Sequence, residues 1–307
     1  MMFSQVPHTL LMIRPASFGY NPETAASNAF QKLPASIEEV SKKAMKEFDE
    51  VVLILRKQGI DVMVIDDIPQ PVTTDAVFPN NWISTHQDGK IILYPMMAPS
   101  RRQERRDDIV LLLKEKFEVR EVIDLSSNEE KEKFLEGTGS IIFEHPNKIA
   151  YACRSARTND ELFSQLCAKI GYAPVLFEAK DENGMAVYHT NVMMWIGEKL
   201  AAICLDSLSD EDQEIVLDSF SKTGHRVIAL SFQQMRAFAG NMFEAKNKKD
   251  QRFLLMSETA FESLLPGQLK EIQKYAVPLP LSIPIIEESG GGSIRCMVAG
   301  IHLPKSE

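Results

Sequence analysis

Apolar residues recur along this chain at two spacings, and the spacing predicts which element each segment forms. Ser36 precedes apolar residues spaced three and four apart, and Gly59 follows the last of them. This pattern predicts a helix that is capped by serine and ended by glycine. Residues 60–65 alternate between buried-type and polar side chains, which predicts a strand. Further strands are expected at residues 9–15, 118–125, 174–178, 226–230 and 277–283, and further helices at residues 104–116, 211–221, 259–275 and from residue 159.

Pairs of short apolar segments joined by turns lie between these elements. Residues 81–86 with 90–95, and 139–143 with 149–153, have the pattern of β-hairpins. A small polar residue is expected to open the first strand of each pair, and these residues recur about every fifty positions. They are Asn81, Ser140, Asn191, Asn241 and Ser293, with gaps of 59, 51, 50 and 52 residues.

A unit of hairpin, helix and strand that repeats at this period indicates a repeat architecture. Because the units are α/β and the chain is short, we expect a closed ring of five units rather than an open solenoid. The first unit is expected to come from residues before Asn81, and residues 1–307 are expected to form one catalytic domain. Chance periodicity is the alternative, and five matches make it the weaker one.

Composition and charge narrow the class of protein. Of 307 residues, 44% are hydrophobic and 25% charged, as in a globular protein with a sizeable core. The net charge of −9 argues against nucleic acids and anionic membranes as partners. No apolar run approaches the ~20 residues that span a bilayer. The four cysteines have no CxxC spacing, which indicates neither a zinc site nor a disulfide framework, so a cytoplasmic location is expected.

A glycine run at residues 290–292 precedes Cys296, which is where a nucleophilic thiol would be placed beside a flexible loop. The alternative is that Cys296 is a small buried apolar residue. His189, Glu136 and Asp75 lie near the polar marker of other units, so a ring brings all four residues to one cavity. A thiol, an imidazolium that stabilises its thiolate, and an orienting carboxylate suffice for covalent catalysis. The histidines have no HxH, HxxE or HExxH spacing, so neither a metal nor another cofactor is expected.

Five sequence runs resemble the guanidine-modifying superfamily, the penteins. They are DAVFPNNW, EGTGS, RSARTN, YHTNV and GGGSIRC, and the resemblance extends in order from Arg14 to Pro304. The superfamily includes arginine deiminases, dimethylarginine dimethylaminohydrolases and amidinotransferases, and this chain is most similar to citrulline-utilisation hydrolases. The resemblance implies a five-bladed α/β propeller with pseudo-fivefold symmetry, which agrees with the repeat.

The resemblance also implies roles for single residues. Cys296 matches the nucleophile, His189 the acid and base, and Glu136 the carboxylate that orients the histidine. Asp75 matches the acidic residue that holds the nitrogen head of the substrate, and Phe78, in the same run, is expected to contact substrate.

Two arginines match residues that grip a substrate α-carboxylate, a task suited to the bidentate guanidinium. They are Arg157 and Arg101. For Arg101 a solvated helix start is the alternative, because three further arginines follow it. Arg295 is expected to point away from the face that carries Cys296.

This chain departs from relatives that act on guanidinium groups at two positions. Asn81 and Ser140 stand where those hydrolases usually have carboxylates. A site for a cationic head should keep its counter-charges, so a neutral ureido substrate such as citrulline is predicted, with ornithine, ammonia and carbon dioxide as products. The alternatives are an arginine deiminase, a dimethylarginine hydrolase or an amidinotransferase, and, outside enzymes, a pentein-fold binding module.

The remaining expectations concern access and assembly. Residues 16–34 have no clear period and are predicted to form a lid, with Phe18 and Asn21 as contacts. The expected partner is a small amino-acid substrate. The sequence does not decide whether the protein is a monomer or a homo-oligomer.

Overall fold

Five small sheets make up the strand content of this protein. The computed structural model describes the chain except residues 1–2, 26–27, 29, 34–35 and 307. The first sheet contains β15 (Ala299–Ile301), β1 (Thr9–Arg14) and β2 (Asp61–Asp66). The next two contain β3 (Ile83–Thr85), β4 (Lys90–Leu93) and β5 (Glu121–Asp124), and β6 (Ile142–Glu144), β7 (Ile149–Cys153) and β8 (Ala173–Phe177). The last two contain β9 (Met194–Ile196), β10 (Leu200–Ile203) and β11 (Arg226–Ala229), and β12 (Phe243–Lys246), β13 (Arg252–Ser257) and β14 (Val277–Leu281).

All five sheets share one topology. The middle strand pairs antiparallel with one neighbour and parallel with the other. Helices connect the middle strand to its parallel neighbour, as parallel pairing requires. These helices are α2 (Ile37–Lys57), α4 (Asp107–Lys116), α6 (Asp160–Ile170), α8 (Asp210–Thr223), and α10 (Glu258–Ser263) with α11 (Pro266–Ile272). The repeated unit of hairpin, helix and strand is therefore confirmed in four sheets. In the first sheet, β15 comes from residues 299–301, so the expectation that this unit forms from residues before Asn81 is wrong for that strand.

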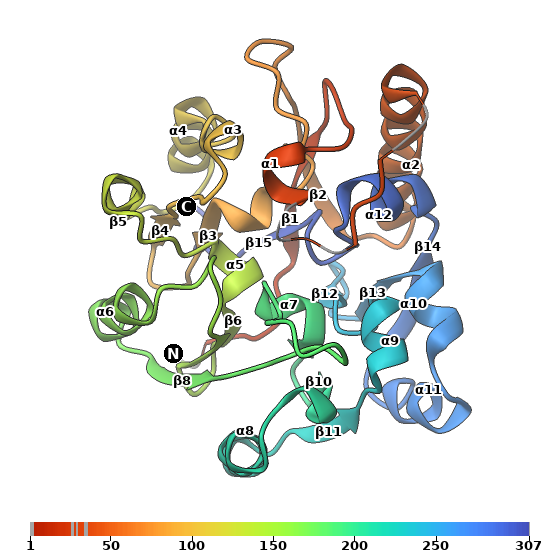
Figure 1. Ribbon diagram of the computed structural model, residues 1–307. Coiled ribbons are helices and arrows are strands. Elements are labelled where there is room, and N and C mark those ends of the chain that lie inside the picture. Colours follow the sequence, from red (N-terminus) through yellow and green to blue (C-terminus); the bar gives the residue numbers. More distant parts are fainter. Residues whose placement is uncertain (1–2, 26–27, 29, 34–35, 307) are drawn as a thin grey trace.

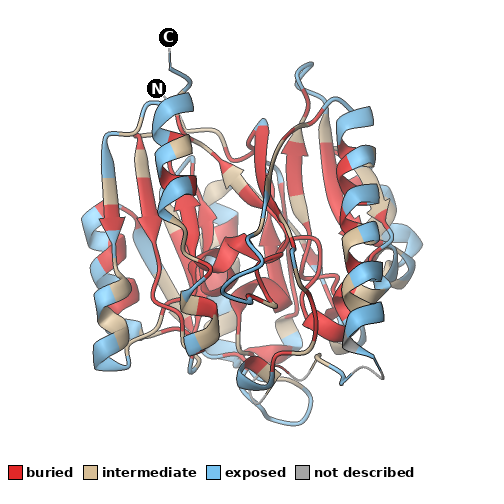
Figure 2. Cartoon of the chain, turned by 90° about the horizontal axis from the view of Figure 1, so that it is seen from above, coloured by how far each residue is buried: buried red, intermediate tan, exposed pale blue. Residues whose placement is uncertain are grey.

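The helices and the short turns occupy different places in the molecule. Figure 1 shows α2, α4, α6, α8 and α11 at the outer edge, and α5 (Gly137–Ser140) and α7 (Thr190–Met193) near the middle. Figure 2 shows the strands largely buried and the outer helices exposed on their outward sides. The remaining short helices are α1 (Pro22–Ala25), η1 (Pro79–Asn81), α3 (Pro99–Arg102), η2 (Ser126–Lys131), η3 (Leu205–Ser207), α9 (Phe232–Arg236) and α12 (Pro284–Gly290).

Helix α2 illustrates why the outer helices form where the sequence predicts. The Ser36 side chain accepts a hydrogen bond from the Glu39 backbone N–H at its start. Ala44, Phe48 and Leu55 lie on one stripe and are fully buried. Both the predicted limits and the predicted buried face are confirmed.

The polar marker residues do not open strands, which corrects the sequence prediction. Asn81, Ser140 and Asn191 lie in the single turns η1, α5 and α7, and the strands begin two or more residues later. The turns are joined by hydrogen bonds between neighbouring units. Thr138 donates to the Asn80 carbonyl, Thr190 to the Ser140 carbonyl, and Asn241 to the Asn191 carbonyl. Polar side chains of these turns, including that of the marker residue Asn241, therefore hold adjacent units together at the centre.

One other predicted element differs from the structure, and one helix near the glycine run was not predicted. The helix expected at residues 104–116 begins later, as α4 at Asp107, because residues 103–106 form a turn and irregular chain between α3 and α4. The unpredicted helix is α12, which ends at Gly290, and its C-cap residue Gly291 is left-handed with φ of 62°. Among the described residues, no helix is long and apolar enough to cross a membrane.

Candidate active site

The central turns surround a pocket that contains Cys296. Seven of the eight predicted site residues line this pocket, and Glu136 lies behind them against His189. The lining residues come from the turns, the glycine run and residues 24–31: Thr24, Asn28, Gln31, Asp75, Phe78, Asn81, Arg101, Arg157, Tyr188, His189, Gly290, Gly291, Gly292 and Cys296. The structure thus brings the predicted residues together, while their catalytic and binding roles stay predictions.

His189 and Glu136 form a buried pair. His189 Nε2 lies 2.8 Å from Glu136 Oε2, and neither side chain is more than slightly exposed. Burial raises the pKa of Glu136, but Arg157, the His189 hydrogen bond and Arg101 together outweigh it and hold this pKa well below its usual value. Glu136 is therefore a carboxylate, and it fixes the imidazole so that Nδ1 is left for the pocket.

The protonation state of His189 differs from the sequence prediction of an imidazolium. Burial lowers the pKa of His189 to about 4, against the raising effect of Glu136, and Arg157 and Arg101 lower it further. The imidazole is therefore neutral at pH 7 in this closed state. A neutral ring can accept the proton of a thiol before it donates that proton to a leaving group.

Two amides contact the sulfur of Cys296. Asn191 Nδ2 and Asn241 Nδ2 each lie 3.3 Å from Cys296 Sγ. Backbone partners fix the orientation of Asn241, because its Nδ2 also donates to the Asn191 carbonyl and its Oδ1 accepts from the Arg295 N–H. An N–H group therefore faces the sulfur, and Asn241 Oδ1 lies 3.6 Å from it. The sequence prediction assigned these amides no role, although their recurrence at the marker positions was the available signal.

The two predicted carboxylate-binding arginines are buried among protein partners. Arg157 donates to Glu136 Oε2 at 3.3 Å and to the Thr24 carbonyl at 3.1 Å, and its Cζ lies 5.0 Å from the centre of the Tyr188 ring. Arg101 is only 3% exposed, which excludes the solvated helix start. Its Nε and Nη2 bind both oxygens of Glu104 at 2.9 Å, a partner that the sequence prediction missed.

Two polar atoms of the pocket walls have no hydrogen-bond partner among the described residues. They are Asp75 Oδ1 and Asn81 Nδ2. The second oxygen of Asp75 accepts from Asn21 Nδ2 at 2.7 Å, and Asn81 Oδ1 accepts from Arg101 Nη1 at 2.9 Å. The pocket therefore offers one acceptor and one donor whose orientations are set by neighbouring side chains.

The predicted lid segment covers this pocket. Asn28 Nδ2 donates to the Gly291 carbonyl, and Gln31 Nε2 donates to the Gly290 carbonyl. Phe18 packs edge-on against Phe78 with ring centres 6.5 Å apart. Of the predicted lid, Pro34 and residues 26, 27 and 29 lie outside the described residues. The cavity left beneath measures about 20 Å³, room for about one water, so an amino acid can enter only when the lid moves.

Arg295 points to a different cavity from Cys296, as the sequence predicts. It lines a space among the inner strands, although it lies in a turn before β15 rather than in a strand. Among the described residues, no group of three or more His, Cys, Asp or Glu side chains is placed to hold a metal ion.

Comparison with known families gives a match over most of the chain. The sequence profile described as N,N dimethylarginine dimethylhydrolase, eukaryotic, matches residues 14–303. The chain belongs to this family. The family lies in the guanidine-modifying superfamily, so the resemblance found in the sequence is confirmed. A search of curated proteins gives no match.

Solved structures show the same fold at low sequence identity. The substrate-bound N-terminal domain of ArgZ, an arginine dihydrolase from cyanobacteria, is 12% identical with a TM-score of 0.74, covering 96% of this chain and 98% of that one. The complex of AgrE with L-arginine is 14% identical with a TM-score of 0.75, covering 97% of this chain and 41% of that one. A dimethylarginine dimethylaminohydrolase adduct is 16% identical with a TM-score of 0.65, covering 96% of this chain and 99% of that one. The expected class, a hydrolase of C–N bonds outside peptides, is confirmed for this family member.

Proposed function

We propose that this family member hydrolyses a ureido amino acid of the citrulline type through a covalent intermediate on Cys296. The observation that carries the proposal is a pair of buried atoms, Asp75 Oδ1 and Asn81 Nδ2, that have no hydrogen-bond partner among the described residues. Both residues line the pocket that Cys296 and His189 also line. A substrate head that satisfies both atoms must present a donor to Asp75 and an acceptor to Asn81.

A ureido group meets this requirement and a guanidinium group does not. The ureido group has N–H donors and a carbonyl oxygen that accepts, whereas a guanidinium has only donors. Asn81 cannot simply turn its amide over, because its Oδ1 already accepts from Arg101. Leaving a buried N–H unpaired costs about 1–3 kcal/mol, which disfavours arginine in this arrangement.

The reaction follows from the positions of the side chains. His189 takes the proton of Cys296, and the sulfur attacks the ureido carbon. The C–N bond to the substrate side chain breaks, and the leaving amine takes the proton from His189. Water, deprotonated by His189, then attacks the Cys296 thiocarbamate and releases the thiol and carbamic acid. Carbamic acid decomposes to ammonia and carbon dioxide, so citrulline and water give ornithine, ammonia and carbon dioxide.

A guanidino substrate is the second candidate, and one observation favours it. Burial raises the pKa of Asp75, although Arg101, Asn21 and Arg157 oppose the rise. A cationic head against Asp75 would stabilise its carboxylate. The family description and the ArgZ and AgrE structures name dimethylarginine or arginine for those proteins.

We also propose that the five sheets close into a five-bladed propeller that forms one catalytic domain. In every sheet, one strand pairs antiparallel with the middle strand. These five strands line one cavity, and they are β3, β6, β9, β12 and β15. Contacts between β15 and β3, β6 and β9, and β9 and β12 support a ring of neighbouring sheets.

The test measures product release from citrulline and from arginine, supplied separately to the purified protein. We expect ornithine and ammonia from citrulline, abolished in Cys296→Ala. Asn81→Asp replaces the Nδ2 donor of this side chain with an oxygen that accepts. We expect the ratio of arginine turnover to citrulline turnover to rise about tenfold or more. If the unchanged protein turns over arginine and does not turn over citrulline, the ureido proposal is overturned. The covalent mechanism on Cys296 is not affected by that result.

A further inference from the structure

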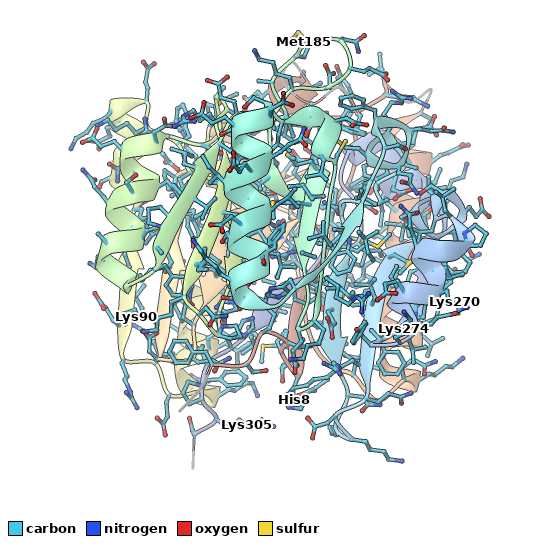
Figure 3. All side chains as sticks on the ribbon, turned by 90° about the horizontal axis from the view of Figure 1, so that it is seen from below. His8, Lys90, Met185, Lys270, Lys274 and Lys305 are labelled. Carbon is cyan, nitrogen blue, oxygen red and sulfur yellow. The ribbon has the colours of Figure 1, made fainter. Side chains whose placement is uncertain are left out.

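The cavity that the five inner strands surround, which we call the axial cavity, is separate from the pocket of Cys296. It measures about 50 Å³, and its lining includes Gln5, His145, Glu244, Arg295 and His302. Gln5 and His302 lie three residues from His8 and Lys305 in the sequence. Figure 3 shows His8 and Lys305 at the end of the molecule opposite Met185, which lies beside the lid. The axial cavity therefore belongs to the other end of the fold.

Arg295 brings a positive charge into this cavity without an acidic partner. Its side chain is 9% exposed, and no described Asp or Glu lies within salt-bridge distance of it. Its Nη1 donates to the Val298 carbonyl at 3.1 Å, and its Cζ lies 4.7 Å from the centre of the Phe243 ring. Its Nε and Nη2 donate to no described residue. Burial lowers the pKa of Arg295 to about 10, which leaves it cationic at neutral pH.

Two histidines in the same cavity also have unused ring nitrogens. The rings of His145 and His302 lie 4.3 Å apart between centres. His145 Nδ1 contacts the Tyr172 hydroxyl at 2.8 Å, and its Nε2 has no described hydrogen-bond partner. Neither ring nitrogen of His302 has one. Burial and the nearby positive charges, including Arg295, lower the pKa of both histidines.

We propose that the axial cavity binds a small oxyanion of the phosphate type, held by Arg295, His145 and His302. Buried charges in proteins are normally paired. A guanidinium whose Nε and Nη2 form one edge without a described acceptor matches the oxygens of such an anion. The cavity volume admits an inorganic ion and excludes a nucleotide.

Glu244 is the acidic residue that lines the same cavity, and its Oε1 has no hydrogen-bond partner among the described residues. Its Oε2 accepts from the Glu198 N–H at 2.9 Å, and its Oε1 lies 3.7 Å from Arg252 Nε. Burial raises the pKa of Glu244 to about 7, which reduces the negative charge that an anion would meet. Lys246, two residues further along β12, adds to the positive potential at His302.

The bound anion would also act on the turn that carries the nucleophile. Arg295 precedes Cys296, and the Arg295 N–H donates to Asn241 Oδ1 at 3.1 Å. The same asparagine donates to Cys296 Sγ. An anion that fixes the Arg295 side chain in the axial cavity therefore also restrains Arg295 and Asn241, which position the thiol of Cys296.

The test measures thermal unfolding against inorganic phosphate, with sodium chloride at matched ionic strength as the baseline. We expect Tm to rise by about 2–4 °C at saturating phosphate. Arg295→Met should abolish the rise. His302→Phe, which keeps the ring and removes its donors, should weaken phosphate binding about tenfold.

Arg157→Met is the matched control, because Arg157 is a buried arginine of the other pocket. It should keep the full phosphate-induced rise. If Arg157→Met removes the rise, or if phosphate has no effect beyond sodium chloride, the axial site is disproved. If Arg295→Met does not fold, the test compares His302→Phe with the unchanged protein. The phosphorus NMR signal of phosphate should broaden less with His302→Phe than with the unchanged protein. Equal broadening with these two proteins contradicts the proposal.

Discussion

The residues around the sulfur of Cys296 explain how a buried thiol can become a nucleophile in a site where the histidine is neutral. His189 is uncharged at pH 7 because burial lowers its pKa to about 4, so it supplies no fixed positive charge. The donors that face the sulfur are instead the amides of Asn191 and Asn241, each 3.3 Å away. Charge-assisted hydrogen bonds of this kind strengthen when the sulfur loses its proton.

We predict that Asn241→Ala slows alkylation of Cys296 by iodoacetamide at pH 7 about tenfold. A hydrogen bond to a charged acceptor contributes about 1.5–3 kcal/mol, and the variant removes one such bond from the thiolate. The measurement is the alkylation rate against pH, with Cys296→Ala to subtract other thiols. Asn128→Ala, which removes an amide that bonds a backbone carbonyl far from the site, is the control. An unchanged rate in Asn241→Ala would show that the amide does not act on the sulfur.

At this scale the sequence predicted which residues meet in the pocket better than it predicted their partners. Cys296, His189, Glu136 and Asp75 stand in recognisable runs, and the structure places them together. Glu104 could not be singled out, because its pairing with Arg101 depends on the burial of both side chains. The contacts of the lid depend on its position over the glycine run, which local sequence does not encode.

At the scale of elements, one carboxylate connects the long outer helix to the helix that carries the glycine run. Glu47 of α2 accepts from the backbone N–H groups of Ile285 and Ile286, in the first turn of α12, at 2.9 and 3.0 Å. Gly290, which receives the lid residue Gln31, ends the same helix. The position of the glycine run therefore depends on a contact with α2.

We predict that this contact makes stability depend on pH. Burial raises the pKa of Glu47 to about 7, although the two backbone N–H groups lower it. A raised native pKa adds stability below the unfolded value near 4.5, and this stability is lost as pH rises toward 7. Because the group is only partly buried, we expect a loss of about 1 kcal/mol between pH 5 and pH 8.

Urea unfolding at both pH values tests this expectation. Glu47→Gln keeps an acceptor and cannot ionise, so its stability relative to the unchanged protein should rise from pH 5 to pH 8. Glu50→Gln, an exposed carboxylate on the same helix, should show no such change. Equal pH dependence in both variants would exclude Glu47 as the source.

Element prediction succeeded where an element is long enough to show a period. Helix α2 was predicted to its cap, because several turns of apolar spacing precede Gly59. The single turns η1, α5 and α7 have three or four residues, too few to display a helical period. The polar residues in these turns were therefore predicted to open the strands that follow.

For the whole molecule, the repeat predicted five equivalent units, and five sheets of one topology are observed. Closure into one cooperative domain remains a proposal, and the two tryptophans can test it. Trp82 lies before β3 and Trp195 lies in β9, and both are buried, in different hydrophobic clusters. Trp82→Phe and Trp195→Phe each leave a single tryptophan as a local reporter.

We predict that the tryptophan fluorescence of each variant follows the same urea transition as its own circular dichroism. One closed domain should unfold in a single cooperative step that both probes report. Midpoints that differ between fluorescence and circular dichroism in either variant would indicate separate units.

The pairing of β15 with β1 has a consequence for synthesis of the chain on the ribosome. β1 and β2 emerge early, but Leu10 and Leu11 gain their antiparallel partners only when Ala299 and Gly300 emerge. At about 5–20 residues per second, the first sheet waits roughly 15–60 s for its third strand. Cys296 is translated immediately before that strand. The nascent chain therefore exposes an unpaired strand edge for most of its synthesis, and the thiol of Cys296 is added only moments before the sheet can be completed.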